Sequence, residues 1–213
     1  MITRKYYLTS LVLAIILSLS SCSSKAPQME SDENFIEYAI DVTGGFYTPK
    51  QASFLMTMEE VLQIKGLTQS EVEIDYGTGN NNDRILVTMT HPSLPDASYL
   101  KEVFTFEKKL DTKHLIRVEY FIFVDTELAH SLCDELYNQA KEHLGTPEND
   151  DPDFYLKRHS VRWEDEQGEQ GNRIDLFLTD NRNQAPAFDG KTCILLSLYI
   201  SRDTFDNFFS ETP

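Results

Sequence analysis

Side chains that could perform chemistry are scattered along this chain and do not form a catalytic motif. Five histidines occur in it. His130 and His143 share one predicted helix, yet they lie thirteen residues apart and lack the His-Glu-x-x-His spacing of a zinc site. The nucleophile elbow Gly-x-Ser-x-Gly, the P-loop and the dinucleotide-binding glycine motif are also missing from the sequence. We therefore predict no catalytic residue, metal ligand or cofactor, and expect a protein that is not an enzyme.

Acidic side chains dominate the composition. Asp and Glu number 35 against 19 Lys and Arg, which gives a formal charge of −16. The acidic stretches 148–153 and 180–183 lack the alternating oxygen ligands and the terminal Glu of a calcium-binding loop, so we expect solvated loops there. A field of this sign repels phosphate backbones, and nucleic acid is not an expected partner.

The first residues carry the one motif that is highly specific. Arg4 and Lys5 precede an apolar run at 8–19, which is the pattern of a secretory signal. The run is shorter than the ~20 apolar residues that a spanning helix needs. It ends at Leu19-Ser20-Ser21-Cys22, which resembles the lipobox of bacterial lipoproteins. In that family the cysteine thiol is joined to a diacylglycerol and the preceding peptide is removed. The alternative is ordinary secretion with a free Cys22.

The resemblance implies a lipid anchor on the extracytoplasmic side of a cell membrane. It divides the chain into a signal peptide (1–21), a lipidated polar tether (22–34) and a single domain (35–213). Loss of the signal removes Arg4 and Lys5 but no acidic residue, so the charge would change from −16 to −18. A domain this acidic is not expected to lie flat on anionic lipids. The sequence does not determine the type of bacterial envelope or the oligomeric state.

Two segments have helical signals. Thr57 and Glu60 have the spacing of a capping box, and Gly66 is a plausible end for this first helix. The second helix is predicted over 126–144, with Thr126 as its cap, and Gly145 ends it. Period-two alternation predicts strands near 72–76, 85–89, 103–106, 115–124, 161–163, 174–178 and 194–200.

This order predicts an α+β domain with two layers, in which helices cover one face of a mostly antiparallel sheet. Each of the segments 35–125 and 126–213 contains a helix followed by strands, so two related halves and two unrelated halves are both open. The helix at 57–66, with strands that end in Phe104-Thr105-Phe106, resembles small lipoprotein domains related to the outer-membrane assembly component SmpA and to the β-lactamase-inhibitor-like fold. That resemblance implies a module for protein binding or envelope assembly.

Cys133 and Cys193 are the cysteines of the predicted domain. An exported protein could bridge them. However, if Ile194 and its alternating neighbours face the helices, Cys193 points to the other side of the sheet. We therefore expect no bridge, unless a bulge reverses the alternation.

One face of the sheet has an unusual composition. Side chains opposite the main aliphatic stripe mix aromatic and charged types, and the candidate binding face consists of Arg117, Glu119, Phe121, Phe123, Phe177 and Tyr199. The alternative is that the segment 35–54, with Phe46, Tyr47 and Phe54, covers this face as part of the core. By the same alternation in the strand 115–124, Ile116 is expected to belong to the main aliphatic stripe, and Leu115 is expected to lie on the opposite side of the sheet.

The leading functional hypothesis is a lipid-anchored, extracytoplasmic binding or envelope-assembly module whose partner is another envelope protein. The alternative is a cell-surface hydrolase or sensor subunit with an unrecognised site. A histidine that meets two carboxylates in a deep cleft would favour the enzyme, whereas a broad aromatic sheet face would favour binding.

Overall fold

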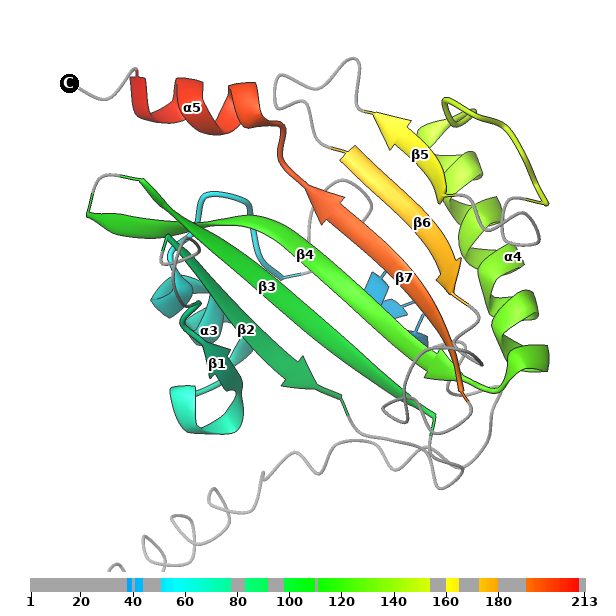
Figure 1. The fold of residues 1–213 in the computed structure, drawn as a ribbon, viewed down its shortest axis with the longest axis horizontal. Coiled ribbons are helices and arrows are strands. Elements are labelled where there is room, and N and C mark those ends of the chain that lie inside the picture. Colours follow the sequence, from blue (N-terminus) through cyan, green and yellow to red (C-terminus); the bar gives the residue numbers. More distant parts are fainter. Residues whose placement is uncertain are drawn as a thin grey trace, which may run out of the picture.

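A computed structural model describes residues 38–39, 41–43, 51–77, 83–91, 98–109, 111–153, 160–164, 173–179 and 191–210. The predicted signal peptide and tether, with Cys22, lie outside these ranges. The strands form one seven-stranded sheet in the order β1-β2-β3-β4-β7-β6-β5 (Figure 1). In chain order the elements are α3 (Met58–Lys65), the 3-10 turn η1 (Gln69–Glu71), β1 (Glu73–Asp75), β2 (Arg84–Thr90), β3 (Tyr99–Lys109), β4 (Thr112–Val124), α4 (Thr126–Leu144), β5 (Ser160–Glu164), β6 (Arg173–Thr179), β7 (Thr192–Tyr199) and α5 (Arg202–Ser210).

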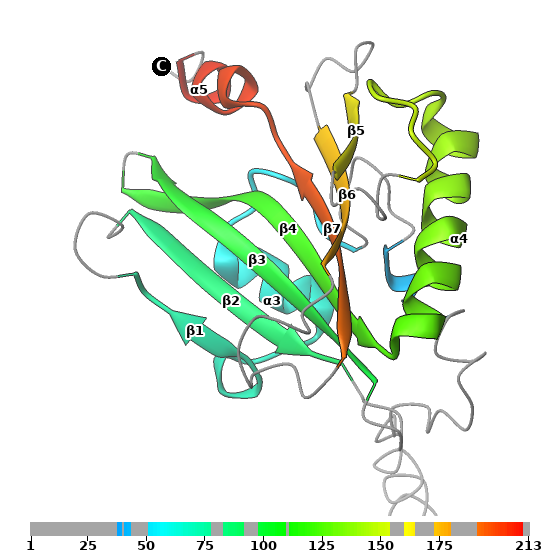
Figure 2. The ribbon, with the colours of Figure 1, turned by 45° about the vertical axis from the view of Figure 1, so that its right-hand side comes forward.

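The fold is α+β, as predicted. Every neighbouring pair of strands is antiparallel. Helices α3 and α4 pack on the same face, together with the helical residues 38–39 and 41–43. Figure 1 shows α3 behind the sheet, and the turned view of Figure 2 shows α4 and the short helical segment to the right of β7. This helix-covered face holds the core. We call the opposite face of the sheet the second face.

Helix α3 begins and ends where its sequence signals predict. Glu60 Oε2 accepts a 2.8 Å hydrogen bond from the Thr57 amide, and the Thr57 hydroxyl accepts one from the Glu60 amide, so the capping box is complete. Gly66 then adopts a left-handed conformation with φ of 68°. Glycine reaches this region without the Cβ clash that penalises other residues.

Helix α4 has the predicted bounds but a different cap. Its N-cap is Asp125, one residue before the predicted Thr126, and the Asp125 carboxylate accepts from Lys191 Nζ at 2.8 Å instead of capping a backbone amide. The buried side of α4 contains Ala129, Leu132, Cys133, Leu136, Tyr137 and Ala140. The apolar spacing therefore predicted this side, apart from Tyr137.

A β-bulge in the β3–β4 pair corrects the predicted orientation of two residues. The register shifts between Thr105 and Phe106, so that Phe106 pairs with Leu115 and skips Ile116. As a result, Leu115 turns into the core and is fully buried, whereas Ile116 is only half-buried. The prediction for these two residues was wrong because plain alternation cannot account for an inserted residue.

The topology favours two unrelated halves. Strands β3 and β7 both run antiparallel to β4, which separates them, so they point in the same direction. The preceding strands of each half lead away to opposite edges of the sheet, while α3 and α4 lie on one face. A rotation that placed β1, β2 and β3 on β5, β6 and β7 with the same strand directions would turn the sheet over. The helix of the rotated half would then lie on the opposite face from the helix of the other half.

Candidate functional site

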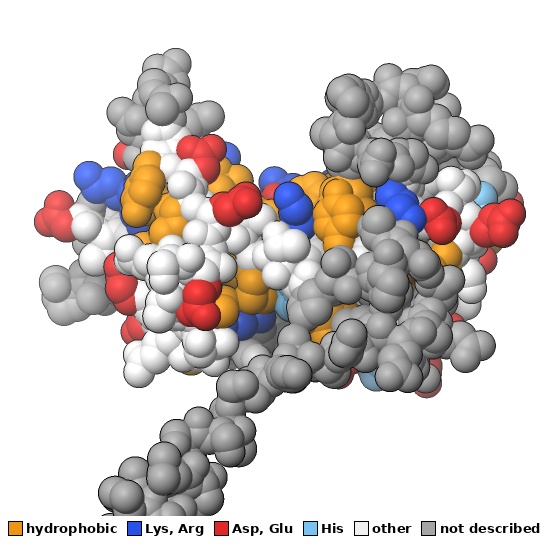
Figure 3. Space-filling view, turned by 90° about the horizontal axis from the view of Figure 1, so that it is seen from below, with side chains coloured by type: hydrophobic (Ala, Val, Ile, Leu, Met, Phe, Trp, Pro, Cys, Tyr) orange, Lys and Arg blue, Asp and Glu red, His pale blue; other side chains and the backbone are white. Residues whose placement is uncertain are grey.

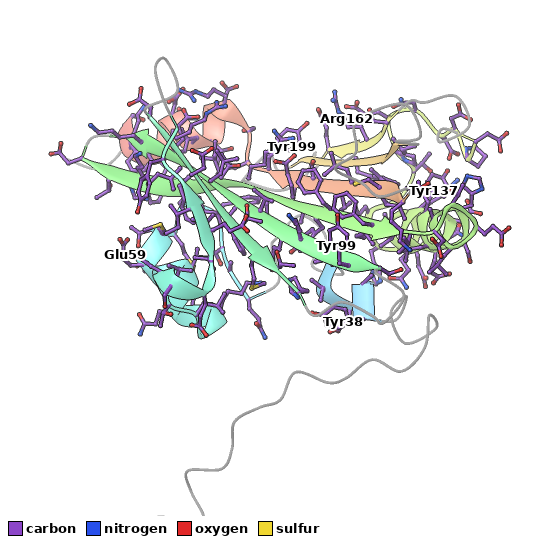
Figure 4. The ribbon with its side chains drawn as sticks, turned by 60° about the horizontal axis from the view of Figure 1, so that its bottom comes forward. Tyr38, Glu59, Tyr99, Tyr137, Arg162 and Tyr199 are labelled. Carbon is purple, nitrogen blue, oxygen red and sulfur yellow. The ribbon has the colours of Figure 1, made fainter. Side chains whose placement is uncertain are left out.

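Five of the six residues of the predicted binding face, Arg117, Glu119, Phe121, Phe123 and Tyr199, occupy one face of the sheet, and the side chain of the sixth, Phe177, lies outside the described part of the structure. Backbone register pairs Arg117 with Tyr199, and Phe121 with Leu195, which in turn pairs with Phe177. Glu119 lies between the two rows. Figure 4 shows Tyr199 and Arg162 on the opposite side of the sheet from Tyr38 and Glu59, as expected for the second face.

Phe123 is not an accessible anchor. Only 4% of its surface is exposed, and its ring stacks on Tyr99 with the centroids 4.4 Å apart. Phe121 and Tyr199 are half-buried, and the Arg117 side chain is 43% exposed. The accessible part of the candidate face therefore centres on Arg117, Phe121 and Tyr199.

The segment 35–54 was predicted as an alternative cover for this face, and its described residues, 38–39, 41–43 and 51–54, lie on the helix side. Ala39, Val42 and Phe54 belong to the core cluster on the helix side. The Leu55 amide donates to the Leu115 carbonyl at 2.8 Å, which joins the chain directly after this segment to β4. Phe46 and Tyr47 lie outside the described residues.

The second face is hollowed next to α5. Two adjoining hollows have volumes of about 560 Å³ and 490 Å³. They share four lining residues, which we use to define the groove: Arg84, Ile116, Tyr199 and Ile200. The bulge that exposes Ile116 and the turn from β7 into α5 therefore shape this surface together.

Charged side chains at the floor of the groove are paired. Arg117 Nη2 lies 2.7 Å from Glu119 Oε1, and the Ser197 hydroxyl donates to the same carboxylate oxygen at 3.4 Å. The Arg117 guanidinium also lies over the Tyr199 ring, 5.8 Å from its centroid. These contacts hold the Arg117 guanidinium over an aromatic ring, and both arginine and aromatic residues are enriched at protein interfaces.

A second charged group borders the groove at α5. Arg84 Nε and Nη2 donate to Glu107 Oε2 at 3.2 and 3.0 Å, and Arg202 Nη1 donates to the other oxygen of Glu107. Asp206 accepts from Arg202 Nε at 3.1 Å and from Lys109 Nζ at 2.7 Å. These bonds hold the pKa of the Asp206 carboxyl below its usual range, with the bond from Lys109 as the main cause.

All arginines whose side chains the structure describes lie on the second face or at its border. Three of them lie on strands, at positions that alternate with the core stripe, and the fourth begins α5: Arg84, Arg117, Arg162 and Arg202. Figure 3 shows basic and hydrophobic side chains interleaved along the upper part of the view, with acidic side chains among them. In a chain of charge −16, this face is set apart by its content of arginine.

No known protein family matches this chain, and neither a curated protein nor a solved structure matches it. The resemblance to SmpA-related domains and the lipobox therefore stay predictions. Among the described residues, no helix is both long enough and apolar enough to cross a bilayer. Cys133 and Cys193 are both buried and unbridged, as the alternation predicted.

The sequence reasoning missed a buried polar cluster on the helix side. Glu102 of β3 is fully buried, and its carboxylate accepts from Lys65 Nζ at 2.9 and 3.1 Å. His91 Nε2 lies 3.3 Å from the same carboxylate, and His91 Nδ1 contacts the Tyr38 hydroxyl. A carboxylate only accepts, so in the neutral imidazole Nε2 carries the proton and Nδ1 accepts from Tyr38. The sequence did contain a signal for this cluster. Glu102 falls at every second position together with Leu100, Phe104 and Phe106, so alternation places its side chain on the core side of β3.

This cluster has the composition of a proton relay but not the properties of a nucleophile. Burial, followed by the charges of Glu102 and Asp41, raises the pKa of Tyr38 to about 12. The hydroxyl therefore keeps its proton near neutral pH and acts as a donor. His91 meets one carboxylate here, and the two hollows lie on the opposite face of the sheet. Within the described ranges, no group of three His, Cys, Asp or Glu side chains could hold a metal ion.

Helix α5, one wall of the groove, was also missed. The Ser201 hydroxyl accepts from the Thr204 amide at 3.1 Å, which caps the helix start. Phe205 is buried, and its ring centroid lies 5.4 Å from that of Phe209. The sequence did contain a signal for α5. Ser201 is a residue type that favours helix N-caps, and Phe205, Phe208 and Phe209 follow it at helical spacing.

Proposed function

We propose that this chain is a lipid-anchored, extracytoplasmic binding module that captures another envelope protein on the second face of its sheet. The groove beside α5 is the observation that carries the proposal. Arginine and aromatic side chains from three strands and a helix line it, and both residue types are enriched at protein interfaces. The lipobox supports the location, and the polar tether supports a domain that stands clear of the lipid.

The arrangement favours binding over hydrolysis. Hydrolysis by general acid–base chemistry needs titratable groups positioned around a substrate in a cleft. The histidine that contacts a buried carboxylate lies on the helix side, and the groove contains paired arginines instead. A second copy of the chain is a poor partner, because two lipid-anchored molecules, each of charge −18 after loss of Arg4 and Lys5, repel each other at long range.

Site-specific photocrosslinking tests the binding face. The full chain would carry p-benzoylphenylalanine in place of Phe121 and be irradiated in intact cells. We expect a discrete adduct with an envelope protein. A matched control carries the same group in place of Ile64, which is 48% exposed on α3, on the helix side. Equal adducts from the two positions, or an adduct from position 64 alone, would show that the second face is not the interface.

The lipid anchor has its own test. The Cys22→Ala variant should lose the detergent-phase partitioning of the wild-type protein while its domain keeps the same thermal unfolding. A wild-type protein found wholly in the aqueous phase would exclude the anchor without bearing on the groove.

A further inference from the structure

The hollow under α5 combines guanidinium donors with an apolar floor. Its lining includes Arg84 and Arg202 together with Ile200 and Phe205, in a volume of about 490 Å³. A hollow of this size holds one or two amino-acid residues, and its lining offers a charged end and a hydrophobic end.

Arg84 and Arg202 both line this hollow and keep N–H donors beyond those that bind Glu107 and Asp206. A guanidinium has five N–H donors. Arg84 donates through Nε and Nη2 to Glu107, while Arg202 donates through Nη1 to Glu107 and through Nε to Asp206. The remaining N–H donors of the two guanidinium groups have no partner among the described residues. The side chain of Arg84 is 54% exposed and that of Arg202 is 62% exposed.

Glu107 makes this pair a prepared site for an anion. Its side chain is only 11% exposed, and the two arginines approach its two different oxygens. One carboxylate thereby holds two guanidinium groups side by side, which lowers the conformational entropy that a ligand must remove on binding. Planar guanidinium forks bind carboxylates in bidentate fashion.

We propose that the hollow under α5 binds the carboxyl terminus of a partner chain whose last residue is apolar. The terminal carboxylate lies against Arg84 and Arg202, and the last side chain packs on Ile200 and Phe205. This inference rests on the proposed function and names the part of the partner that enters the groove. The acidic charge of the chain repels acidic proteins, so the terminus belongs to a partner that is neutral or basic overall.

Asp203 provides a control whose substitution should change the affinity for a carboxylate in the opposite direction to substitution of the arginines. It lines the same hollow, next to Arg202 in sequence. A bound carboxylate would be repelled by it, so the Asp203→Asn variant should bind the ligand more tightly. Arg162 is the matched arginine control, because it lies on the second face but does not line either hollow.

The test compares probes that differ in one group. Saturation-transfer NMR would measure binding of N-acetylphenylalanine, N-acetylphenylalanine amide and N-acetyl-Ala-Ala-Phe to the full chain in detergent. We expect both free acids to bind and the amide to bind about tenfold more weakly, as expected for the loss of a charge-assisted contact. Arg84→Gln and Arg202→Gln should each weaken binding of the acids by a similar factor, Asp203→Asn should strengthen it, and Arg162→Gln should leave it unchanged.

Three results would overturn the inference. Equal binding of the acid and the amide would show an apolar hollow without a carboxylate site. Loss of binding on extension to the tripeptide would show a site for a small free acid rather than a chain terminus. No binding of any probe would exclude the site. If the crosslink at position 121 still forms in these cases, the proposed function stands and only the carboxylate inference fails.

Discussion

The buried ion pair of Lys65 and Glu102 offers the sharpest test of the structure. The Lys65 side chain is 8% exposed and that of Glu102 is 0% exposed, with 2.9 Å between Nζ and Oε1. At this distance and an effective dielectric constant of about 20, the attraction is about 5 to 6 kcal/mol before desolvation is subtracted. Lys65→Met leaves the Glu102 carboxylate buried without its ammonium partner, so unfolding should become easier by about 3 to 5 kcal/mol.

A double-mutant cycle separates the pair from its surroundings. Glu102→Leu leaves a lysine near the end of α3, where it can turn toward water, so the loss should be smaller than for Lys65→Met. The double variant removes both charges and fills the site with apolar atoms. We expect its free energy of unfolding to lie near that of the wild type.

The assay is urea unfolding monitored by fluorescence of Trp163. It is the single tryptophan of the chain and is 1% exposed. Lys141→Met is the matched control, because Lys141 and Asp150 are also 2.9 Å apart but about 40% exposed, and water screens exposed ion pairs so that they contribute little to stability. If Lys65→Met costs no more than Lys141→Met, the pair is not buried and the packing of α3 described above is wrong.

Three further predictions concern other buried groups. Because the pKa of Tyr38 is raised from 10.0 to about 12, its contribution to stability should be complete below pH 10 and lost as the pH rises to 12. Urea unfolding at several alkaline pH values should therefore show a larger loss for the wild type than for Tyr38→Phe. Burial raises the pKa of the Cys133 and Cys193 thiols to about 12, so iodoacetamide at pH 8 should label neither in the folded protein and both in urea, as read by mass spectrometry. Phe123→Ala should lower the unfolding free energy by about 3 to 5 kcal/mol in urea titration, whereas Tyr199→Ala, on a half-buried residue, should cost less than half as much.

The fold was largely readable from local signals. The capping box at Thr57, the stop at Gly66 and the apolar spacing of 126–144 are local patterns, and each fixed an element boundary to within a residue. Strand alternation likewise predicted that Arg117 and Tyr199 share a face. That prediction needs only the two-residue period of a strand and the assumption that the two strands, β4 and β7, lie side by side.

The groove was less predictable, because its shape depends on contacts between distant segments. The bulge that turns Ile116 out of the core arises from the pairing of β3 with β4, and no single residue of β4 predicts its position. Arg84 and Arg202 are 118 positions apart in sequence and meet only because α5 returns to the β3–β4 hairpin. A sequence pattern marks which residues are arginine, but not which of them converge.

The two faces of the sheet place their charges in different environments, and this difference decides what each set of charges can do. On the helix side, Glu102 and Lys65 are desolvated, so any change in either one is transmitted to the stability of the domain. On the second face, Arg84 and Arg202 keep more than half of their side-chain surface in water while a shielded Glu107 fixes their spacing. A ligand can therefore approach those arginines without unfolding the core. Substitution of Arg84 or Arg202 should change binding and leave the urea midpoint nearly constant, whereas substitutions in the buried cluster should do the reverse.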